Sequence, residues 1–128
     1  MGVELKSYYH GTRSDHAVGE KLSAGGESNY ALQTPATHSY FTDDLEAATW
    51  QAELSNGNGS PTIYLVDPVG LFEDNPNPAL QDLVTYPSKL YRSLHPVTVS
   101  GRVETLQLHK EFEVAAMAER ILKYKSST

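Results

Sequence analysis

The sequence predicts an α+β fold in which strands outnumber helices and long loops separate them. Residues 62–67 are rich in β-branched and aromatic side chains and stop at Pro68, which is typical of a strand. Residues 112–123 carry apolar side chains at helical spacing, which predicts a helix near the end of the chain. These side chains are Val114, Met117, Ala118 and Ile121.

Two strands and a long loop are predicted before residue 42. The strands are expected around 5–9 and at about 37–41. The polar segment 10–28 between them contains Gly11, Gly19, Gly25 and Gly26, which favour a loop over regular structure. A loop of this length is usually functional or carries short helical turns, and this one begins with a histidine.

The remaining elements are a helix, an irregular stretch and a strand. Thr42 is predicted to cap the helix, because its hydroxyl can accept from free N–H groups and acidic residues follow it. Leu45, Ala48 and Ala52 then share one helical face. Prolines at positions 76, 78 and 87 exclude regular structure through most of 73–89, and residues 97–103 are strand-like.

The composition predicts one soluble domain over residues 1–128. The chain has 16 acidic and 10 basic residues, a net charge of -6 and no cluster of Lys and Arg, which disfavours a general nucleic-acid binder. It has no cysteine, which excludes disulfides, thiolate zinc sites and cysteine nucleophiles. No apolar run approaches the roughly 20 residues that span a bilayer, and no secretory signal is present. We expect a monomer in the cytoplasm.

Three short motifs stand at predicted strand ends, where loops can converge on one cleft. They are Tyr9-His10-Gly11-Thr12, His38-Ser39-Tyr40-Phe41-Thr42 and Phe72-Glu73-Asp74-Asn75-Pro76. In the first motif, the His10 ring offers a hydrogen-bond donor, and Gly11 leaves its backbone open to a planar ligand amide. The alternative is a histidine that caps an ordinary turn, and this motif alone does not decide between the two.

The aromatic and acidic residues of these motifs also have two interpretations. Tyr30 and Tyr40 offer flat faces on which an aromatic ring can stack, although the chain has eight tyrosines and most are expected to pack. Glu73 and Asp74 are catalytic candidates or a solvated pair of charges, which is the usual fate of adjacent acids.

In combination, the motifs over residues 10–103 resemble the rifampin ADP-ribosyltransferase (Arr) family in order and spacing. The matching segments are Tyr-His-Gly-Thr, Ser28-Asn29-Tyr30, Tyr40-Phe41-Thr42, Ala52-Glu53-Leu54, Ile63-Tyr64, Pro68-x-Gly70, Phe72-Glu73-Asp74-x-Pro76-Asn77 and Tyr91-Arg92-Ser93. The family is similar to ADP-ribosylating toxins and poly-ADP-ribose polymerases. The resemblance therefore implies a small ADP-ribosyltransferase-like fold with a curved, split, mixed β core, a few short helices and long loops.

The resemblance also implies a function and a set of site residues. The function is an NAD-dependent mono-ADP-ribosyltransferase, of the glycosyltransferase class, that transfers ADP-ribose to a hydroxyl of a rifamycin-type antibiotic and releases nicotinamide without a metal. The catalytic residues would be His10 at the adenine-side ribose, Tyr40 stacked on the nicotinamide and Asp74 near the nicotinamide ribose. The residues that bind NAD would be His10, Gly11, Thr12, Tyr30, Tyr40 and Thr42.

Two departures from the family leave alternatives open. The family typically reads Phe-Glu-Asp-Asp-Pro-Asn, so Asn75 stands where a second acid is expected, and Glu73 is the alternative to Asp74. The basic segment after Asn77 is also replaced, which bears on the acceptor cleft, expected near Tyr86, Leu90 and Tyr91. Transfer to protein or nucleic-acid ends, and a non-catalytic NAD or ADP-ribose reader, remain alternatives.

Overall fold

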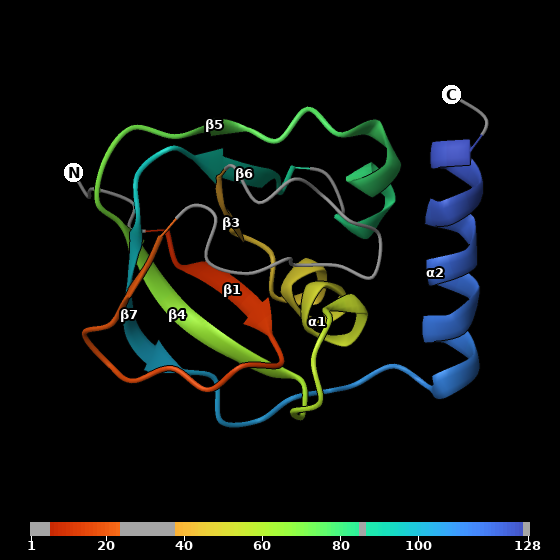
Figure 1. Cartoon of the computed structure of the whole chain (residues 1–128), viewed down its shortest axis with the longest axis horizontal. Coiled ribbons are helices and arrows are strands. Elements are labelled where there is room, and N and C mark those ends of the chain that lie inside the picture. The colour runs from red at the N-terminus through yellow and green to blue at the C-terminus, as the bar shows by residue number, and fades with distance from the viewer. Residues whose placement is uncertain (1–5, 24–37, 85–86, 127–128) are drawn as a thin grey trace.

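A seven-stranded antiparallel sheet with two α-helices forms the architecture of the molecule (Figure 1). The computed structural model describes residues 6–23, 38–84 and 87–126. The strand order is β2-β7-β4-β1-β3-β6-β5. The α+β class is confirmed, and the strand pairings within these described ranges are all antiparallel, whereas the resemblance implied a mixed core.

The elements follow one another from β1 near the N-terminus to α2 at the end of the chain. They are β1 (Tyr8–Thr12), β2 (Lys21–Leu22), β3 (Ser39–Thr42), α1 (Leu45–Leu54), β4 (Thr62–Pro68), β5 (Glu73–Asp74), the 3-10 helix η1 (Pro78–Leu83), β6 (Leu90–Ser93), β7 (Val97–Arg102) and α2 (Glu111–Ser126).

The sheet is split between β1 and β3. Strand β1 pairs with β4 along its whole length, whereas its pairing with β3 is limited to Tyr9 opposite Thr42. Strands β2, β7, β4 and β1 therefore form one half of the sheet, and β3, β6 and β5 form the other. The register between β4 and β7 shifts between Leu65 and Val66, which leaves Ser100 of β7 unpaired in a β-bulge, and a bulged strand bends. These features agree with the expected curved and split β core.

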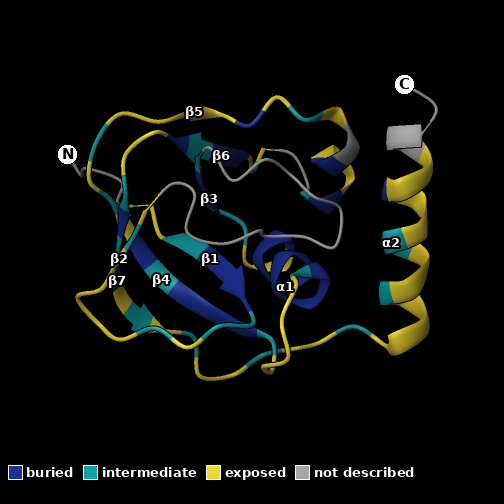
Figure 2. Ribbon diagram, viewed as in Figure 1, coloured by how far each residue is buried: buried dark blue, intermediate teal, exposed yellow. Residues whose placement is uncertain are grey.

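Helix α1 lies between the sheet and the pair formed by η1 and α2. It is buried along Ala47–Leu54, whereas α2 is exposed on its outer side (Figure 2). Ala48 and Ala52 pack on Ile63 of the sheet, and Trp50 belongs to the cluster shared with η1 and α2. The apolar face predicted for the last helix is confirmed, since its four residues pack into this cluster.

Several local predictions were wrong. Strand β1 begins at Tyr8, so His10, Gly11 and Thr12 lie within it rather than in a following loop. The N-cap of α1 is Asp44, whose side chain accepts from Glu46 N–H, and Leu45 is exposed. The proline-rich stretch contains η1, because Pro78 at a helix start has no N–H to leave unsatisfied.

His109 fastens the segment before α2 to α1. Its ring stacks on Trp50, with centroids 3.6 Å apart. Its Nδ1 donates to Glu53 Oε1 at 2.5 Å and its Nε2 to Glu46 Oε2 at 2.7 Å. Burial lowers the pKa of His109, but hydrogen bonds to the Glu53 and Glu46 carboxylates outweigh it, so the pKa is raised. Both ring nitrogens donate only in the protonated ring.

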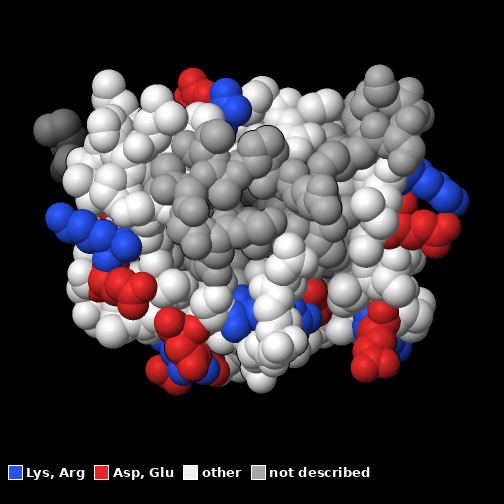
Figure 3. Space-filling model, viewed as in Figure 1, with Lys and Arg blue, Asp and Glu red and all other residues white. Residues whose placement is uncertain are grey.

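Surface charges are interspersed rather than gathered. On the face shown in Figure 3, Lys and Arg side chains lie singly and mostly beside acidic ones. Over the described ranges, no helix is long and apolar enough to cross a membrane. No group of three or more His, Cys, Asp or Glu side chains within those ranges is arranged to hold a metal ion.

Candidate active site at the split in the sheet

A cavity of about 300 Å³ opens where the two halves of the sheet separate. Its lining includes His10 of β1 from one half and Ser39 and Tyr40 of β3 from the other. Leu22 of β2 and Val97 of β7 supply apolar lining. The structure thus brings together two of the three residues predicted to be catalytic, which are 30 positions apart in the sequence.

His10 is fixed in orientation by the opposite half of the sheet. Its side chain is buried, and Nδ1 donates to the Tyr40 carbonyl oxygen at 2.7 Å. Because a carbonyl oxygen only accepts, this bond makes Nδ1 the protonated nitrogen and leaves Nε2 as an acceptor in the neutral ring. His10 also faces Tyr64 across the β1–β4 pair. A buried and oriented imidazole is therefore present at the cavity wall.

Tyr40 joins the cavity to a second histidine. It is 5% exposed, and its ring is tilted against that of His38 with centroids 6.1 Å apart. His38 lines this cavity and also a second hollow of about 270 Å³. Tyr40 thus lines the cavity, and the stacking of its ring on a nicotinamide stays a prediction, whereas Tyr30 lies outside the described residues.

Gly11 is tied to α1 on the opposite side of β1. Its N–H donates to Gln51 Oε1 at 2.9 Å. An added Cβ would lie 2.1 Å from the Ala48 carbonyl oxygen and 2.6 Å from the Ala52 nitrogen, closer than atoms approach. Close packing of the helix on the strand therefore requires glycine here. The N–H predicted to be open to a ligand amide already has a partner.

The two threonines predicted to bind NAD use their hydroxyls in local structure. Thr12 Oγ1 accepts from Ser14 N–H at 3.1 Å. Thr42 Oγ1 donates to the Lys89 carbonyl oxygen at 2.7 Å and accepts from Asp44 N–H at 3.1 Å. Both side chains are buried, and neither residue is part of the cavity lining. A role for them in binding NAD stays a prediction.

The acids of β5 lie away from the cavity lining. Asp74 Oδ2 is 3.1 Å from Lys89 Nζ, and Glu73 Oε2 is 2.6 Å from Arg92 Nε. The carboxylate side chains are 62% and 60% exposed, respectively. Glu73 borders the second hollow, and Asp74 borders neither space. Asp74 is therefore not among the described residues of either lining, and its catalytic role stays a prediction.

Asn75 caps a buried turn. Its Oδ1 accepts from Asn77 N–H at 3.1 Å, and its own N–H donates to the Leu90 carbonyl oxygen at 2.8 Å. Gln81 Nε2 donates to the Asn75 carbonyl oxygen at 3.0 Å. The side chain at position 75 therefore closes the turn before η1 and lies outside the described cavity lining.

The second hollow has an apolar rim. Leu71 is 87% exposed and Leu94 is 71% exposed, and both line it together with Phe72. By contrast, Leu90 and Tyr91, expected in an acceptor cleft, are buried in two apolar clusters of the core, and Tyr86 lies outside the described residues. Exposed apolar side chains at a hollow are typical of a binding surface.

Another set of polar contacts surrounds Asp43 near the start of α1. Lys6 Nζ lies 3.2 Å from Asp43 Oδ2, and the Tyr91 hydroxyl donates to the same oxygen at 3.3 Å. The hydrogen bond to Asp43 raises the pKa of Lys6. Burial and the Asp43 charge raise the pKa of Tyr91. These groups anchor the N-terminal segment to β6.

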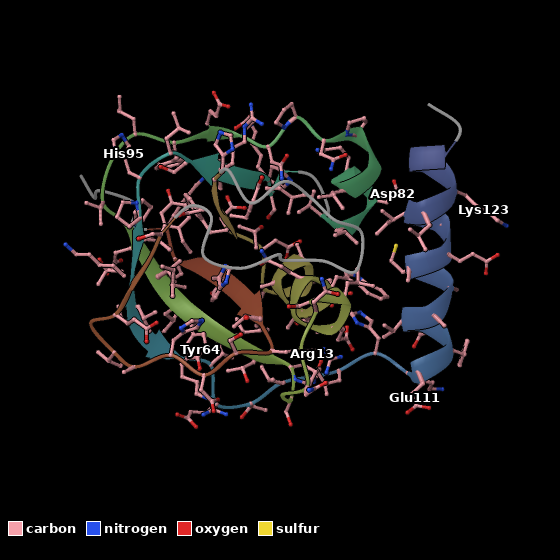
Figure 4. The ribbon with its side chains drawn as sticks, viewed as in Figure 1. Arg13, Tyr64, Asp82, His95, Glu111 and Lys123 are labelled. Atoms are coloured by element: carbon pink, nitrogen blue, oxygen red, sulfur yellow. The ribbon has the colours of Figure 1, made fainter. Side chains whose placement is uncertain are left out.

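His16 and Glu20 are two polar cavity residues that sequence reasoning missed. His16 Nδ1 lies 2.6 Å from Glu20 Oε2, and both residues line the cavity. The His16 ring also packs edge-to-face on Tyr64, which Figure 4 labels on β4. Both residues fall in the segment predicted to be a loop. Their spacing of four residues was the one sequence feature that could have indicated a contact between them.

A comparison with protein families identifies a family for this chain. The family model described as Arr-ms, rifampin ADP-ribosyl transferase, matches residues 8–106. The chain belongs to this family. The part of the chain that matches the family model begins with β1 and includes both halves of the sheet, α1 and the cavity. Helix α2 lies beyond the matched part. A comparison with curated proteins gives no significant match.

Proposed function

We propose that this member of the family transfers ADP-ribose from NAD to a hydroxyl of a rifamycin-type small molecule and releases nicotinamide. The observation that carries the proposal is the meeting of His10 and Tyr40 at one cavity, in a chain whose family acts as rifampin ADP-ribosyl transferases. A cytoplasmic, monomeric, metal-independent enzyme is part of the same proposal.

The cavity fits one part of NAD. Its volume of about 300 Å³ is at the lower end of small-molecule sites, which suits a nicotinamide and its ribose rather than the whole dinucleotide. Tyr40 offers an aromatic face to the nicotinamide ring. When the His10 ring is neutral, its Nε2 would accept a hydrogen bond from a hydroxyl of the adenine-side ribose. The adenine base would extend beyond the cavity.

The proposed reaction exchanges one bond at ribose C1′ for another. The bond from C1′ to the positively charged nicotinamide nitrogen breaks, and its electron pair neutralises that nitrogen. Positive charge develops on the ribose as an oxocarbenium ion. A hydroxyl oxygen of the acceptor then bonds to C1′ and gives its proton to the solvent. The protein contributes by holding the two reactants in position and by placing negative charge near the ribose.

The second hollow suits an apolar acceptor. It shares His38 with the cavity, so a molecule seated there lies next to the nicotinamide end of the proposed NAD site. Leu71, Phe72 and Leu94 supply apolar surface, and Arg92 with Glu73 supplies polar groups at its edge. A bulky apolar molecule with few hydroxyls matches this lining better than a polyanion does.

A reader that binds NAD or ADP-ribose without turnover is the second candidate function. It is favoured by Asn75, which caps a turn where the family typically has an acid, and by the exposure of Glu73 and Asp74. A binding site can persist without the group that stabilises the transition state.

Mass spectrometry of rifampin incubated with the protein and NAD tests the proposal. We expect a product heavier by one ADP-ribose, free nicotinamide in equal amount, and no effect of a metal chelator. The variant His10→Ala should form little product. NAD binding in calorimetry, without nicotinamide release for rifampin, protein or nucleic-acid ends, would instead identify a reader.

A further inference from the structure

Glu20 is an acidic residue whose side chain lines the cavity. Within the described lining, the other polar side chains are histidines, serines, a lysine and a tyrosine, and Glu20 alone carries a negative charge. The acids of β5 are absent from this lining and are paired with Lys89 and Arg92 at the edge of the sheet. The proposed reaction requires negative charge beside the ribose.

The backbone around Glu20 is held by a tight turn. Gly19 has a φ of 93°, in the left-handed region that favours glycine. Its N–H donates to the Val99 carbonyl oxygen at 2.7 Å, and Val99 N–H donates to the Glu20 carbonyl oxygen at 2.9 Å. Glu20 N–H also donates to the Ala17 carbonyl oxygen at 3.0 Å. These bonds fix the start of the Glu20 side chain against β7.

Two donors orient the carboxylate itself. Ala17 N–H donates to Glu20 Oε1 at 3.1 Å, and His16 Nδ1 donates to Oε2 at 2.6 Å. Both hydrogen bonds lower the pKa of Glu20 and keep it ionised, and the bond from Ala17 has the larger effect. Each carboxylate oxygen has a second lone pair, and the side chain is 42% exposed, so it can accept further hydrogen bonds.

Tyr64 in turn holds His16. The His16 backbone N–H donates to the Tyr64 hydroxyl at 2.8 Å, and the two rings meet edge-to-face with centroids 5.5 Å apart. Tyr64 is buried on β4, directly opposite His10. The same strand pair therefore positions His10 and, through Tyr64 and His16, the carboxylate of Glu20.

We infer that Glu20 is a catalytic residue whose carboxylate accepts from the nicotinamide ribose hydroxyls and stabilises the positive charge on the ribose, and that His16 positions it. This inference rests on the proposed function and names the residue that supplies its negative charge. A carboxylate already held by donors needs no reorganisation when charge develops, which is the condition for electrostatic catalysis.

The variant Glu20→Gln tests the inference because it keeps an oxygen acceptor for Ala17 N–H and removes the charge. We expect kcat for nicotinamide release to fall on the order of 10²-fold, while the Kd for NAD changes by less than about 3-fold, since the charge acts mainly in the transition state. Glu20→Asp, which keeps the charge on a shorter side chain, should retain more activity than Glu20→Gln. The matched control is Glu104→Gln, an exposed acid outside the cavity, which should match the wild type.

His16 is tested by rescue. His16→Leu removes the donor and should lower kcat roughly 10-fold with little change in KM, because the carboxylate loses its orientation. His16→Asn restores a side-chain N–H at a similar distance and should recover most of that loss. Equal activity of His16→Leu and the wild type overturns the positioning role.

Binding and turnover are measured separately, so the two failures are distinguishable. If NAD binds but Glu20→Gln releases nicotinamide within 2-fold of the wild-type rate, or if Asp74→Asn alone abolishes release, the inference is wrong and the proposed function stands. If the wild type binds NAD without turnover, the NMR signal of the Ala17 backbone amide tests whether Glu20 contacts the bound NAD. A shift on NAD addition that Glu20→Gln removes supports the contact, and an unchanged signal overturns it. A wild type that does not bind NAD overturns both.

Discussion

The two sides of strand β1 show how adjacent residues of one motif serve different purposes. His10 lies at the cavity and is held by the Tyr40 carbonyl, while Gly11 faces α1 and is enclosed by the backbone of Ala48 and Ala52. On the cavity side, polar groups from separate strands are oriented around open space. On the α1 side, small residues let a helix approach the sheet closely.

This difference separates residues that set stability from residues that set binding. Side chains alternate across a strand, so one motif necessarily presents its members to opposite surroundings. A change on the α1 side is expected to reduce the free energy of unfolding, and a change on the cavity side is expected to reduce affinity more than stability. The following predictions test that separation, beginning with the largest effect.

Gly11→Ala is expected to destabilise the protein by about 3 kcal/mol or more, since the added methyl group meets backbone atoms that cannot rotate away. Urea unfolding measures this loss. Gly57→Ala serves as the control, because Gly57 has a φ of 127° but no atom closer than 3.5 Å to an added Cβ, and should cost about 1 kcal/mol. Similar losses for both variants would contradict the close packing of β1 on α1.

His10→Ala is expected to raise the Kd for NAD about 10- to 100-fold while reducing stability by only about 1 kcal/mol, the usual contribution of one hydrogen bond. Calorimetry and urea unfolding give the two values. His10→Asn keeps a donor for the Tyr40 carbonyl and lacks Nε2, so it should fold like the wild type and still bind weakly. Wild-type affinity in both variants would remove His10 from the NAD site.

His109→Phe tests the outer side of α1. The variant keeps an aromatic ring that can stack on Trp50 but loses both ion pairs, with Glu53 and Glu46. The pKa of His109 is raised in the folded protein, so its stabilisation is complete below the unfolded pKa of 6.5 and is lost as pH rises through the folded value. We expect the wild type to exceed the variant by about 1–2 kcal/mol at pH 5.5 and by less at pH 8.5. A difference independent of pH would show that the pKa of His109 is the same in the folded and the unfolded protein.

Asp74→Asn is expected to change the free energy of unfolding by less than about 0.5 kcal/mol, because its ion pair with Lys89 is exposed on both sides. Lys89→Met should behave in the same way, and both effects should shrink further in salt. If urea unfolding shows that either variant loses more than about 1 kcal/mol of unfolding free energy, this edge of the sheet is not a solvated surface. Its residues would then contribute to stability, as those on the α1 side of β1 do.

Much of the fold follows from local patterns. The apolar positions of α2 and the β-branched run of β4 were sufficient to predict those elements. Strands β2, β5 and β6 were missed, because two of them have only two residues and gain their identity from pairing with a neighbouring strand. The start of β1 was misplaced for a related reason, since its extent is set by pairing with β4.

The candidate site likewise contains residues that sequence motifs indicated and a residue that they did not. Sequence motifs were sufficient to select His10 and Tyr40, which the tertiary structure brings to one cavity. Glu20 was not predicted to lie at the cavity, because it stands among ordinary loop residues, whereas the acidic motif of β5 is conspicuous in the sequence.

Motif order and local patterns were enough to predict the family and the class of fold, and to select His10 and Tyr40 as candidate site residues. Strand pairing and helix packing, by contrast, show that Gly11 serves packing, that Asn75 caps a turn, and that Glu20 is the one acid among the described residues that line the cavity. The physical reason is that the surroundings of a side chain depend on strand register and on the packing of α1, both of which join residues distant in the sequence.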